Sequence, residues 1–378
     1  MPGLLPDVDP EGLLEYSVVY TDRALNHMSA RFQRVMRGLD ALLKQAYGAS
    51  ATAIVPGSGT FGMEAIARQF ATARRVLVLR HGWFSYRWSQ IFEAGRIPAA
   101  QMVLKARRQA PDRSAPWGPP PIDEVQTTIA SERPDLVFAA HVETASGILL
   151  PDADLARIAA ATHAAGGLFV VDAIASGALW LDMEAIGIDI LVSAPQKAWS
   201  GSPCCAFVML SQRAQAALAQ TTSSSFAGDL KRWVQIMDAY LGGGYAYHST
   251  LPTDALARTL QAMRETADAG FEPLRERQFE LGRRVRAALA ARGFASVAAA
   301  GYEAPCVVVS YTDDDAIASG RRFAELGLQT AAGVPLQCDE GPDFKTFRIG
   351  LFGLAKLQDV QGTVARLEAA LDRLAVRG

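Results

Sequence analysis

Short apolar runs alternate with helix-like segments over the first two-thirds of the chain, and this alternation constrains the fold more than any other feature. The runs carry few polar interruptions, so they predict strands that are buried on both faces. They lie at residues 51–55, 76–79, 136–140 and 206–210, with two more that end at Asp172 and Val192. Strands separated by helices favour a mostly parallel sheet covered on both sides. We therefore predict an α/β fold.

The region after Leu251 and Pro252 has a different character. Two long helices are predicted at residues 253–269 and 273–292. They are followed by a strand at 307–310, a helix at 314–326, a strand near 347–349 and a terminal helix at 357–376. This order predicts a smaller α+β domain.

Composition excludes several classes of protein. The chain has 378 residues, 50% of them hydrophobic and 20% charged, so it can build a large core. The net charge of −2 and the lack of a long basic stripe argue against a nucleic-acid partner. No run of about 20 apolar residues predicts a membrane span, and the N-terminus does not resemble a signal peptide. The four cysteines lack metal-ligand spacing, which favours a reduced cytoplasmic location and no metal.

Two consecutive apolar runs are followed by side chains of complementary chemistry, a carboxylate and an amine. The first ends at Asp172, and the second is followed shortly by Lys197. Consecutive parallel strands bring such groups to the same edge of a sheet. Pyridoxal phosphate (PLP) needs this pair: a lysine that bonds to its aldehyde, and a carboxylate that keeps its ring nitrogen protonated. The pair therefore predicts a PLP site.

A glycine-rich turn, Gly57-Ser58-Gly59-Thr60, leads from the first strand into a helix. Its backbone N–H groups and hydroxyls suit a phosphate. The same stretch satisfies the Gly-x-Gly-x-x-Gly pattern of dinucleotide binders, but no acidic residue ends the next strand. A single phosphate is therefore favoured over a dinucleotide. An aromatic stretch at residues 83–88 offers a ring to stack on the cofactor, although Trp88 is better explained as core.

With these residues in hand, the chain resembles the class V aminotransferases, of PLP fold type I, and within them the alanine–glyoxylate and serine–pyruvate group. The resemblance runs from about Leu39 to the C-terminus. Seven blocks match in family order: residues 57–60 with Glu64-Ala65, then 82–87, 141–147, 171–176, 193–197, 247–252 and 347–351.

The resemblance implies a role for each matching residue. Lys197 and Asp172 match the catalytic lysine and the partner of the ring nitrogen. Arg348 matches the arginine that binds the substrate carboxylate, against the alternative of a surface arginine. Further cofactor contacts are implied for Ser58, Gly59, Thr60, Phe84, Thr144, Gln196, Tyr247 and Thr250. Tyr247 and Thr250 match residues that reach the phosphate of the neighbouring subunit, which implies a homodimer with shared active sites.

The resemblance also implies the architecture and the reaction. We expect a seven-stranded, mostly parallel sheet in a large domain (residues 25–250), a small domain (251–378) and an N-terminal segment near the active site (1–24). The expected reaction moves an amino group from a small amino acid to a 2-oxo acid such as glyoxylate or pyruvate. The chain departs from the family at Ala145, where a hydroxyl residue is common, and in the N-terminal segment. These departures keep open a PLP-dependent lyase or decarboxylase, and the glycine pattern keeps open a dinucleotide-dependent oxidoreductase.

Overall fold

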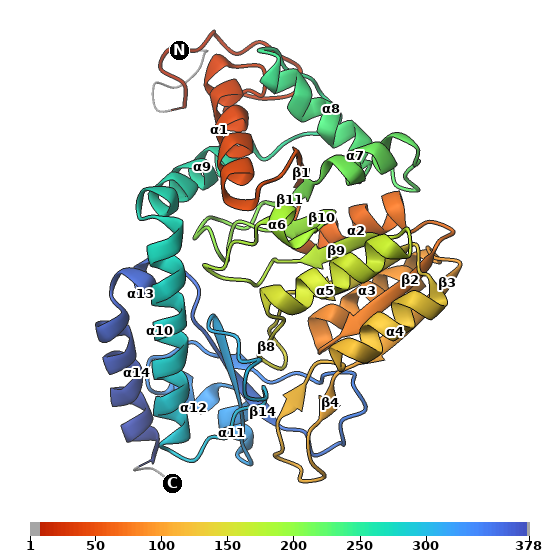
Figure 1. Ribbon diagram of the computed structural model, residues 1–378. Helices are drawn as coiled ribbons and strands as arrows, with labels where there is room; N and C mark the ends of the chain where they lie inside the picture. Colours follow the sequence, from red (N-terminus) through yellow and green to blue (C-terminus); the bar gives the residue numbers. More distant parts are fainter. Residues whose placement is uncertain (1–7, 376–378) are drawn as a thin grey trace.

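The computed structural model describes residues 8–375, and a seven-stranded sheet forms its centre. The strands lie in the order β1–β11–β10–β9–β6–β2–β3 (Figure 1). Their bounds are Ala51–Pro56 (β1), Arg75–Arg80 (β2), Ala100–Lys105 (β3), Leu136–Ala140 (β6), Leu168–Asp172 (β9), Ile190–Ser193 (β10) and Cys205–Leu210 (β11). Strand β11 runs antiparallel to both of its neighbours, β1 and β10, and the other neighbouring pairs are parallel. The predicted mostly parallel sheet of seven strands is confirmed.

Both faces of this sheet are covered. Every residue of β6, β10 and β11 is buried, and successive side chains of a strand point to opposite faces. Helices α2 and α3 pack on each other and on the strands, while α4, α5 and α6 form a second group that contacts β9 through α5. The bounds of these helices are Gly59–Phe70 (α2), Trp83–Gly95 (α3), Ile122–Glu132 (α4), Asp152–Ala164 (α5) and Met183–Ile186 (α6).

Four further helices complete the large part of the molecule. They are Ala30–Tyr47 (α1), Gln212–Ala219 (α7), Leu230–Leu241 (α8) and Thr253–Asp268 (α9). Helix α9 packs against α1, and its buried side chains Leu256, Leu260 and Met263 belong to the core of the large sheet. The domain boundary at residue 251 stays a prediction, and this packing joins α9 to the large part.

A second, smaller sheet lies beside the large one, with its helices grouped at one end of the molecule (Figure 1). Its antiparallel strands are Val307–Tyr311 (β12), Ala331–Ala332 (β13) and Thr346–Gly350 (β14), in the order β12–β14–β13. The helices are Phe271–Ala290 (α10), Asp315–Ala318 (α11), Arg321–Ala324 (α12), Leu354–Gln358 (α13) and Val360–Ala375 (α14). Helices α10 and α14 pack side by side and share a core with β12 and β14.

Two predicted helices are broken in the structure. The helix expected at 314–326 divides into α11 and α12, because Gly320 between them takes a left-handed backbone with φ of +80°. A single glycine with positive φ ends a helical turn at little cost. The terminal helix likewise divides into α13 and α14 around Asp359, whose φ of −132° and ψ of +71° are not helical.

Two small ribbons join the large and small parts. They are formed by Arg107–Arg108 (β4) with Trp117–Gly118 (β5), and by Val142–Glu143 (β7) with Ile148–Leu149 (β8). Isolated bridges link Trp117 to Ala298 and Ile148 to Glu303. A mixed core of side chains from both parts fills the junction. Among residues 8–375, no helix has the length and apolar character needed to cross a bilayer.

Candidate active site

A cavity of about 540 Å³ opens where the carboxyl ends of the central strands face the small sheet. This size lies in the usual range for cavities that bind small molecules, roughly 300–1,000 Å³. Nine of the residues predicted from the sequence line it: Ser58, Gly59, Thr60, Phe84, Thr144, Asp172, Gln196, Lys197 and Arg348. The fold thus brings together side chains that the sequence places almost 300 positions apart.

Asp172 and Lys197 come from neighbouring parallel strands, as predicted. Asp172 ends β9 and is in register with Val192 of β10, and Lys197 follows the end of β10. The Asp172 carboxylate is buried and accepts one bond at 2.9 Å from the backbone N–H of Ile174. Burial raises the pKa of Asp172 to about 7, and the nearby charge of Glu143 adds to the rise.

Lys197 is held in a partly apolar environment. Its Nζ lies 4.5 Å from the centre of the Phe352 ring. Burial lowers the pKa of Lys197, because a desolvated ammonium is less stable than the neutral amine. A lysine with a lowered pKa spends more time as the free amine, which is the form that bonds to an aldehyde or accepts a proton.

The turn at residues 57–60 presents unsatisfied donors to the cavity. Ser58 is the N-cap of α2, yet its hydroxyl makes no capping bond. The first helical bonds come from the N–H groups of Phe61 and Gly62, so those of Gly59 and Thr60 have no partner among the described residues. A Cβ at Gly59 would lie 2.5 Å from Ile174 Cδ1, so any larger residue would have to displace the Ile174 side chain. The turn therefore has the features of an anion site.

Gln196 and Thr144 occupy the wall beside this turn. The Gln196 Oε1 atom is buried and has no hydrogen-bond partner among the described residues. An unpaired buried acceptor is costly, which indicates that a ligand supplies its partner. Thr144 lines the cavity, whereas Ala145 and Ser146 are fully buried behind it. Of the two hydroxyl residues that flank Ala145, only Thr144 therefore faces the cavity.

Phe84 and Arg348 face each other across the cavity. Phe84 lies in the first turn of α3, and Arg348 comes from the central strand of the small sheet. The Arg348 Cζ is 5.7 Å from the centre of the Phe84 ring, and its Nε donates to the Ala332 carbonyl at 2.8 Å. Among the described residues this is the one hydrogen bond that the guanidinium makes, so its remaining N–H groups are available to a ligand in the cavity that Arg348 lines.

Tyr247 and Thr250 lie outside this cavity. The Tyr247 hydroxyl is 3.0 Å from Thr250 Oγ1, and Tyr247 is 53% exposed. Phe61, directly after the turn at residues 57–60, is also 61% exposed. None of residues 8–24 lines the cavity either. Within one chain, these residues take no part in the site, so their predicted roles depend on a second subunit.

Sequence reasoning missed Glu143, a fully buried carboxylate directly behind the cavity. Its two oxygens accept four bonds, from the backbone N–H groups of Phe84, Ser85 and Ala145 and from the Ser85 hydroxyl, at 2.8–3.2 Å. It therefore caps the N-terminus of α3 from another part of the chain. Burial raises the pKa of Glu143, and the hydrogen bonds oppose that rise.

Replacing Glu143 with alanine is expected to lower the free energy of unfolding by about 2–3 kcal/mol, because several buried donors lose their acceptor. The Glu143→Gln variant is the matched control, since its amide oxygen still accepts from the α3 backbone. Urea denaturation of both variants measures the difference. Equal loss in the two variants would show that charge, rather than capping, is what α3 requires.

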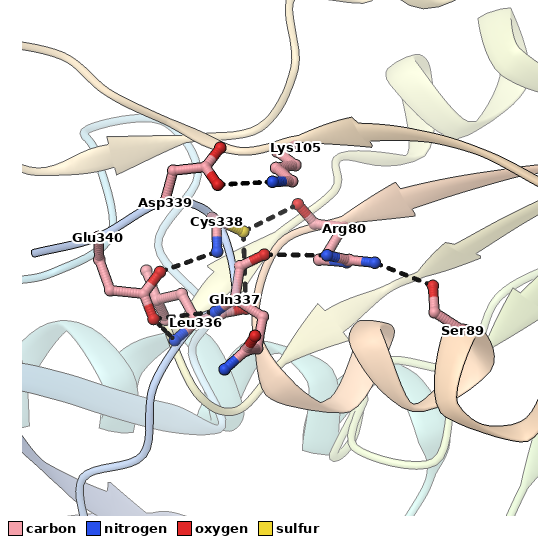
Figure 2. Close-up of polar contacts among 8 residues, drawn as sticks. All are labelled: Arg80, Ser89, Lys105, Leu336, Gln337, Cys338, Asp339 and Glu340. Atoms are coloured by element: carbon pink, nitrogen blue, oxygen red, sulfur yellow. Dashed lines mark hydrogen bonds and ion pairs between the residues drawn. The ribbon is translucent and has the colours of Figure 1, made fainter. Parts of the chain in front are cut away.

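A loop between β13 and β14 fastens the small sheet to the large one (Figure 2). The Arg80 guanidinium donates to the Gln337 carbonyl at 3.1 Å, and Lys105 pairs with Asp339 at 2.6 Å. Inside the loop, the Glu340 carboxylate accepts bonds from three successive backbone N–H groups, those of residues 336–338. Arg348 thus lies on a strand whose preceding loop is bound to the end of β2.

The comparisons with known proteins agree with this geometry. The model of the family described as Aminotransferase class-V matches residues 13–316. A 2-aminoethylphosphonate–pyruvate transaminase of Burkholderia pseudomallei is 30% identical, over 92% of this chain and 90% of that protein. The same enzyme of Paraburkholderia phymatum is also 30% identical, over 99% of this chain and 100% of that protein. The chain belongs to the class V aminotransferase family.

Solved structures place this aminotransferase in fold type I. An alanine–glyoxylate aminotransferase from Nostoc superposes with a TM-score of 0.74 at 24% identity, and the match covers 91% of this chain and 88% of that one. The enzyme is a PLP-dependent aminotransferase that moves an amino group between an amino acid and a 2-oxo acid. The relatives support this reaction over the lyase and decarboxylase alternatives. The dinucleotide pattern has a packing explanation, because a Cβ at Gly62 would lie 2.4 Å from that of Ala206.

The residues of the cavity fit PLP. An amine, a carboxylate and a turn with free donors match its aldehyde, its ring nitrogen and its phosphate. Among the described residues, the buried Gln196 oxygen has no partner, which indicates a place for a ligand. When bound, PLP supplies an electron-withdrawing ring that stabilises negative charge on the carbon that carries the amino group.

Proposed function

We propose that this aminotransferase takes the amino group from a small amino acid and passes it to pyruvate or glyoxylate. The observation that carries the proposal is that Lys197, Asp172 and Arg348 line a single cavity of about 540 Å³. Once the cofactor is bound, the remaining volume of the cavity suits a small substrate. The 2-oxo acids come from the names of the relatives, which include pyruvate and glyoxylate as acceptors.

Each residue has a defined task in this proposal. Lys197 would hold the cofactor at its aldehyde and, once the substrate amine has displaced it, would move a proton to or from the substrate carbon that bears the amino group. Asp172 holds a negative charge beside the ring nitrogen, which favours the protonated ring. Arg348 binds the substrate carboxylate through two parallel hydrogen bonds and so orients that carbon. The cofactor is held by Ser58, Gly59, Thr60, Phe84, Thr144 and Gln196.

The proposal includes a homodimer whose two active sites are shared. Tyr247 and Thr250 lie outside the cavity of their own chain, and Tyr247, Tyr245, Phe226 and Phe61 are large side chains exposed in the single chain. Exposed large apolar side chains of this kind are typical of an interface. In the dimer, Tyr247 and Thr250 reach the phosphate of the partner subunit. The N-terminal segment predicted to lie near the active site is described only from residue 8 onward, and residues 1–7 lie outside the described part of the chain. The cytoplasmic location stays a prediction from cysteine use.

The names of the relatives favour an alternative amino donor. Curated proteins that are 30% identical over most of both chains are 2-aminoethylphosphonate–pyruvate transaminases. That amine carries a phosphonate in place of a carboxylate, and a guanidinium binds either group. Arg348 would then bind the phosphonate of the donor and the carboxylate of the acceptor.

Half-reaction spectroscopy tests the proposal and separates the donors. The PLP-loaded enzyme is mixed with single amines in the absence of a 2-oxo acid, and the absorption band of the lysine-linked cofactor is followed. A true donor converts the cofactor to pyridoxamine phosphate, so the band disappears. Alanine or glycine is expected to do this, and a response to 2-aminoethylphosphonate alone would support the second donor. A band that returns without any 2-oxo acid would indicate lyase chemistry instead.

Replacing Arg348 with alanine is expected to raise the KM for the amino acid about 10- to 100-fold, because one or more bonds to a carboxylate are lost. Arg348→Lys should recover part of the loss, since it keeps the charge but not the paired geometry. Steady-state kinetics give both constants. An unchanged KM in the alanine variant would remove Arg348 from substrate binding.

A further inference from the structure

Arg87 is a cavity residue to which neither the sequence nor the family comparison gave a role. It lies one helical turn after Phe84 on α3 and contributes to the cavity wall. Its Nη1 donates to Thr60 Oγ1 at 3.1 Å, and its Cζ lies 5.0 Å from the centre of the Phe84 ring. The guanidinium is therefore anchored between the phosphate turn and the aromatic side chain.

Arg87 has no carboxylate partner of its own. Within residues 8–375 it forms no ion pair. Glu143 is engaged by the N-terminus of α3. Burial raises the pKa of Asp172, and the Arg87 charge opposes that rise only in part. A guanidinium in a partly buried site without an anion is unfavourable, because its desolvation is not offset. The position therefore calls for an anionic ligand.

The hydrogen-bonding capacity of Arg87 also indicates an anionic ligand. A guanidinium has five N–H donors, and the bond to Thr60 is the one side-chain bond that Arg87 makes in the described chain. The phosphate turn itself offers only neutral groups, namely the Ser58 and Thr60 hydroxyls and backbone N–H groups. A cofactor phosphate carries nearly two negative charges. The other cations of the cavity, Lys197 and Arg348, already have tasks in the proposed function.

We propose that Arg87 binds the phosphate of PLP and supplies the positive charge that the glycine-rich turn lacks. This inference rests on the proposed function, since it assumes that the phosphate lies at residues 58–60. Thr60 has two tasks in this arrangement: it holds Arg87 in place and faces the phosphate. The competing assignment is that Arg87 binds a second acidic group of the substrate.

Binding of PLP and of pyridoxal, which lacks the phosphate, tests the proposal. Both are titrated into the cofactor-free full-length enzyme and its Arg87→Gln and Arg87→Lys variants, with binding followed by absorbance. Arg87→Gln is expected to weaken PLP roughly 10- to 100-fold, the effect of losing bonds to a charged group, while the affinity for pyridoxal stays unchanged. Arg87→Lys should restore part of the PLP affinity, because the charge remains.

The control variant is Arg107→Gln, which removes an exposed arginine that pairs with Glu124 outside the cavity. Circular dichroism and thermal unfolding show whether each variant is folded. Unchanged PLP affinity, or equal loss for PLP and pyridoxal, overturns the proposal. A loss confined to the KM of the amino acid assigns Arg87 to the substrate instead and overturns it too. Borohydride trapping at Lys197 separates this failure from failure of the proposed function, because trapping is expected in every variant at saturating PLP.

Discussion

The Lys197→Ala variant is expected to lose at least about 10⁴-fold in kcat. Proton transfer by a positioned side chain contributes up to about this factor, and the covalent link to the cofactor is lost as well. The structure leaves no substitute, because Lys197 is the lysine that lines the cavity within the described chain. Steady-state assays with an amino acid and a 2-oxo acid measure the loss. PLP itself should still be retained through its phosphate, since residues 58–60 are unchanged.

Borohydride reduction followed by peptide mass analysis provides the control. In the unchanged enzyme, the adduct is expected on the peptide that contains Lys197, and in the alanine variant no adduct should form. Lys105 and Lys356 are present in both proteins and report non-specific reaction. Full activity in the alanine variant, or an adduct at another lysine, would remove Lys197 from the chemistry.

The Asp172→Asn variant is expected to lower kcat by on the order of 10²–10³-fold while the fold is kept. Removing a single fixed charge from a position where charge develops has an effect of this size. The amide oxygen of asparagine can still accept the bond from the Ile174 N–H, so local geometry is preserved. Single-turnover kinetics isolate the chemical step from substrate binding. An unchanged rate would show that the ring nitrogen does not depend on this carboxylate.

The stability of the cofactor-free protein gives an independent measure of Asp172. The folded protein holds a proton at Asp172 up to a pKa of about 7, whereas the unfolded chain loses it near 3.8. Between these values the folded state binds more protons, so stability falls as the pH rises. For one such group, the free energy of unfolding changes by at most about 1.4 kcal/mol per pH unit. In Asp172→Asn this contribution should disappear, and urea denaturation between pH 4 and 7 measures the difference.

The pair at Asp172 and Lys197 could be predicted because its signal is local. Each follows an uninterrupted apolar run, and parallel strands bring their carboxyl ends to one edge. The structure keeps this order, with β9 and β10 as direct neighbours. The glycine-rich turn could be predicted for the same reason, since a turn before a helix exposes its first N–H groups.

Glu143 and Arg87 could not be predicted in this way, because their partners are distant in sequence. Glu143 accepts bonds from a helix 58 residues earlier, and Arg87 is held by a hydroxyl 27 residues away. Neither separation in sequence matches the regular repeat by which a helix or a strand places side chains on one face. The break at Gly320 was missed for a different reason: a lone glycine within a helical pattern is often tolerated, and only its positive φ shows that the helix ends.

The loop at residues 336–340 has a backbone shape that its own side chains hold in place. Gln337 and Asp339 both take left-handed backbones, with φ of +62° and +66°, and the Glu340 carboxylate holds the loop in that shape. Through Gln337 and Asp339 this loop is bound to the ends of β2 and β3, and none of residues 336–340 lines the cavity. Because Arg348 lies on the strand that follows this loop, we expect substitutions there to shift Arg348 relative to the large sheet while Lys197 and Asp172 keep their places.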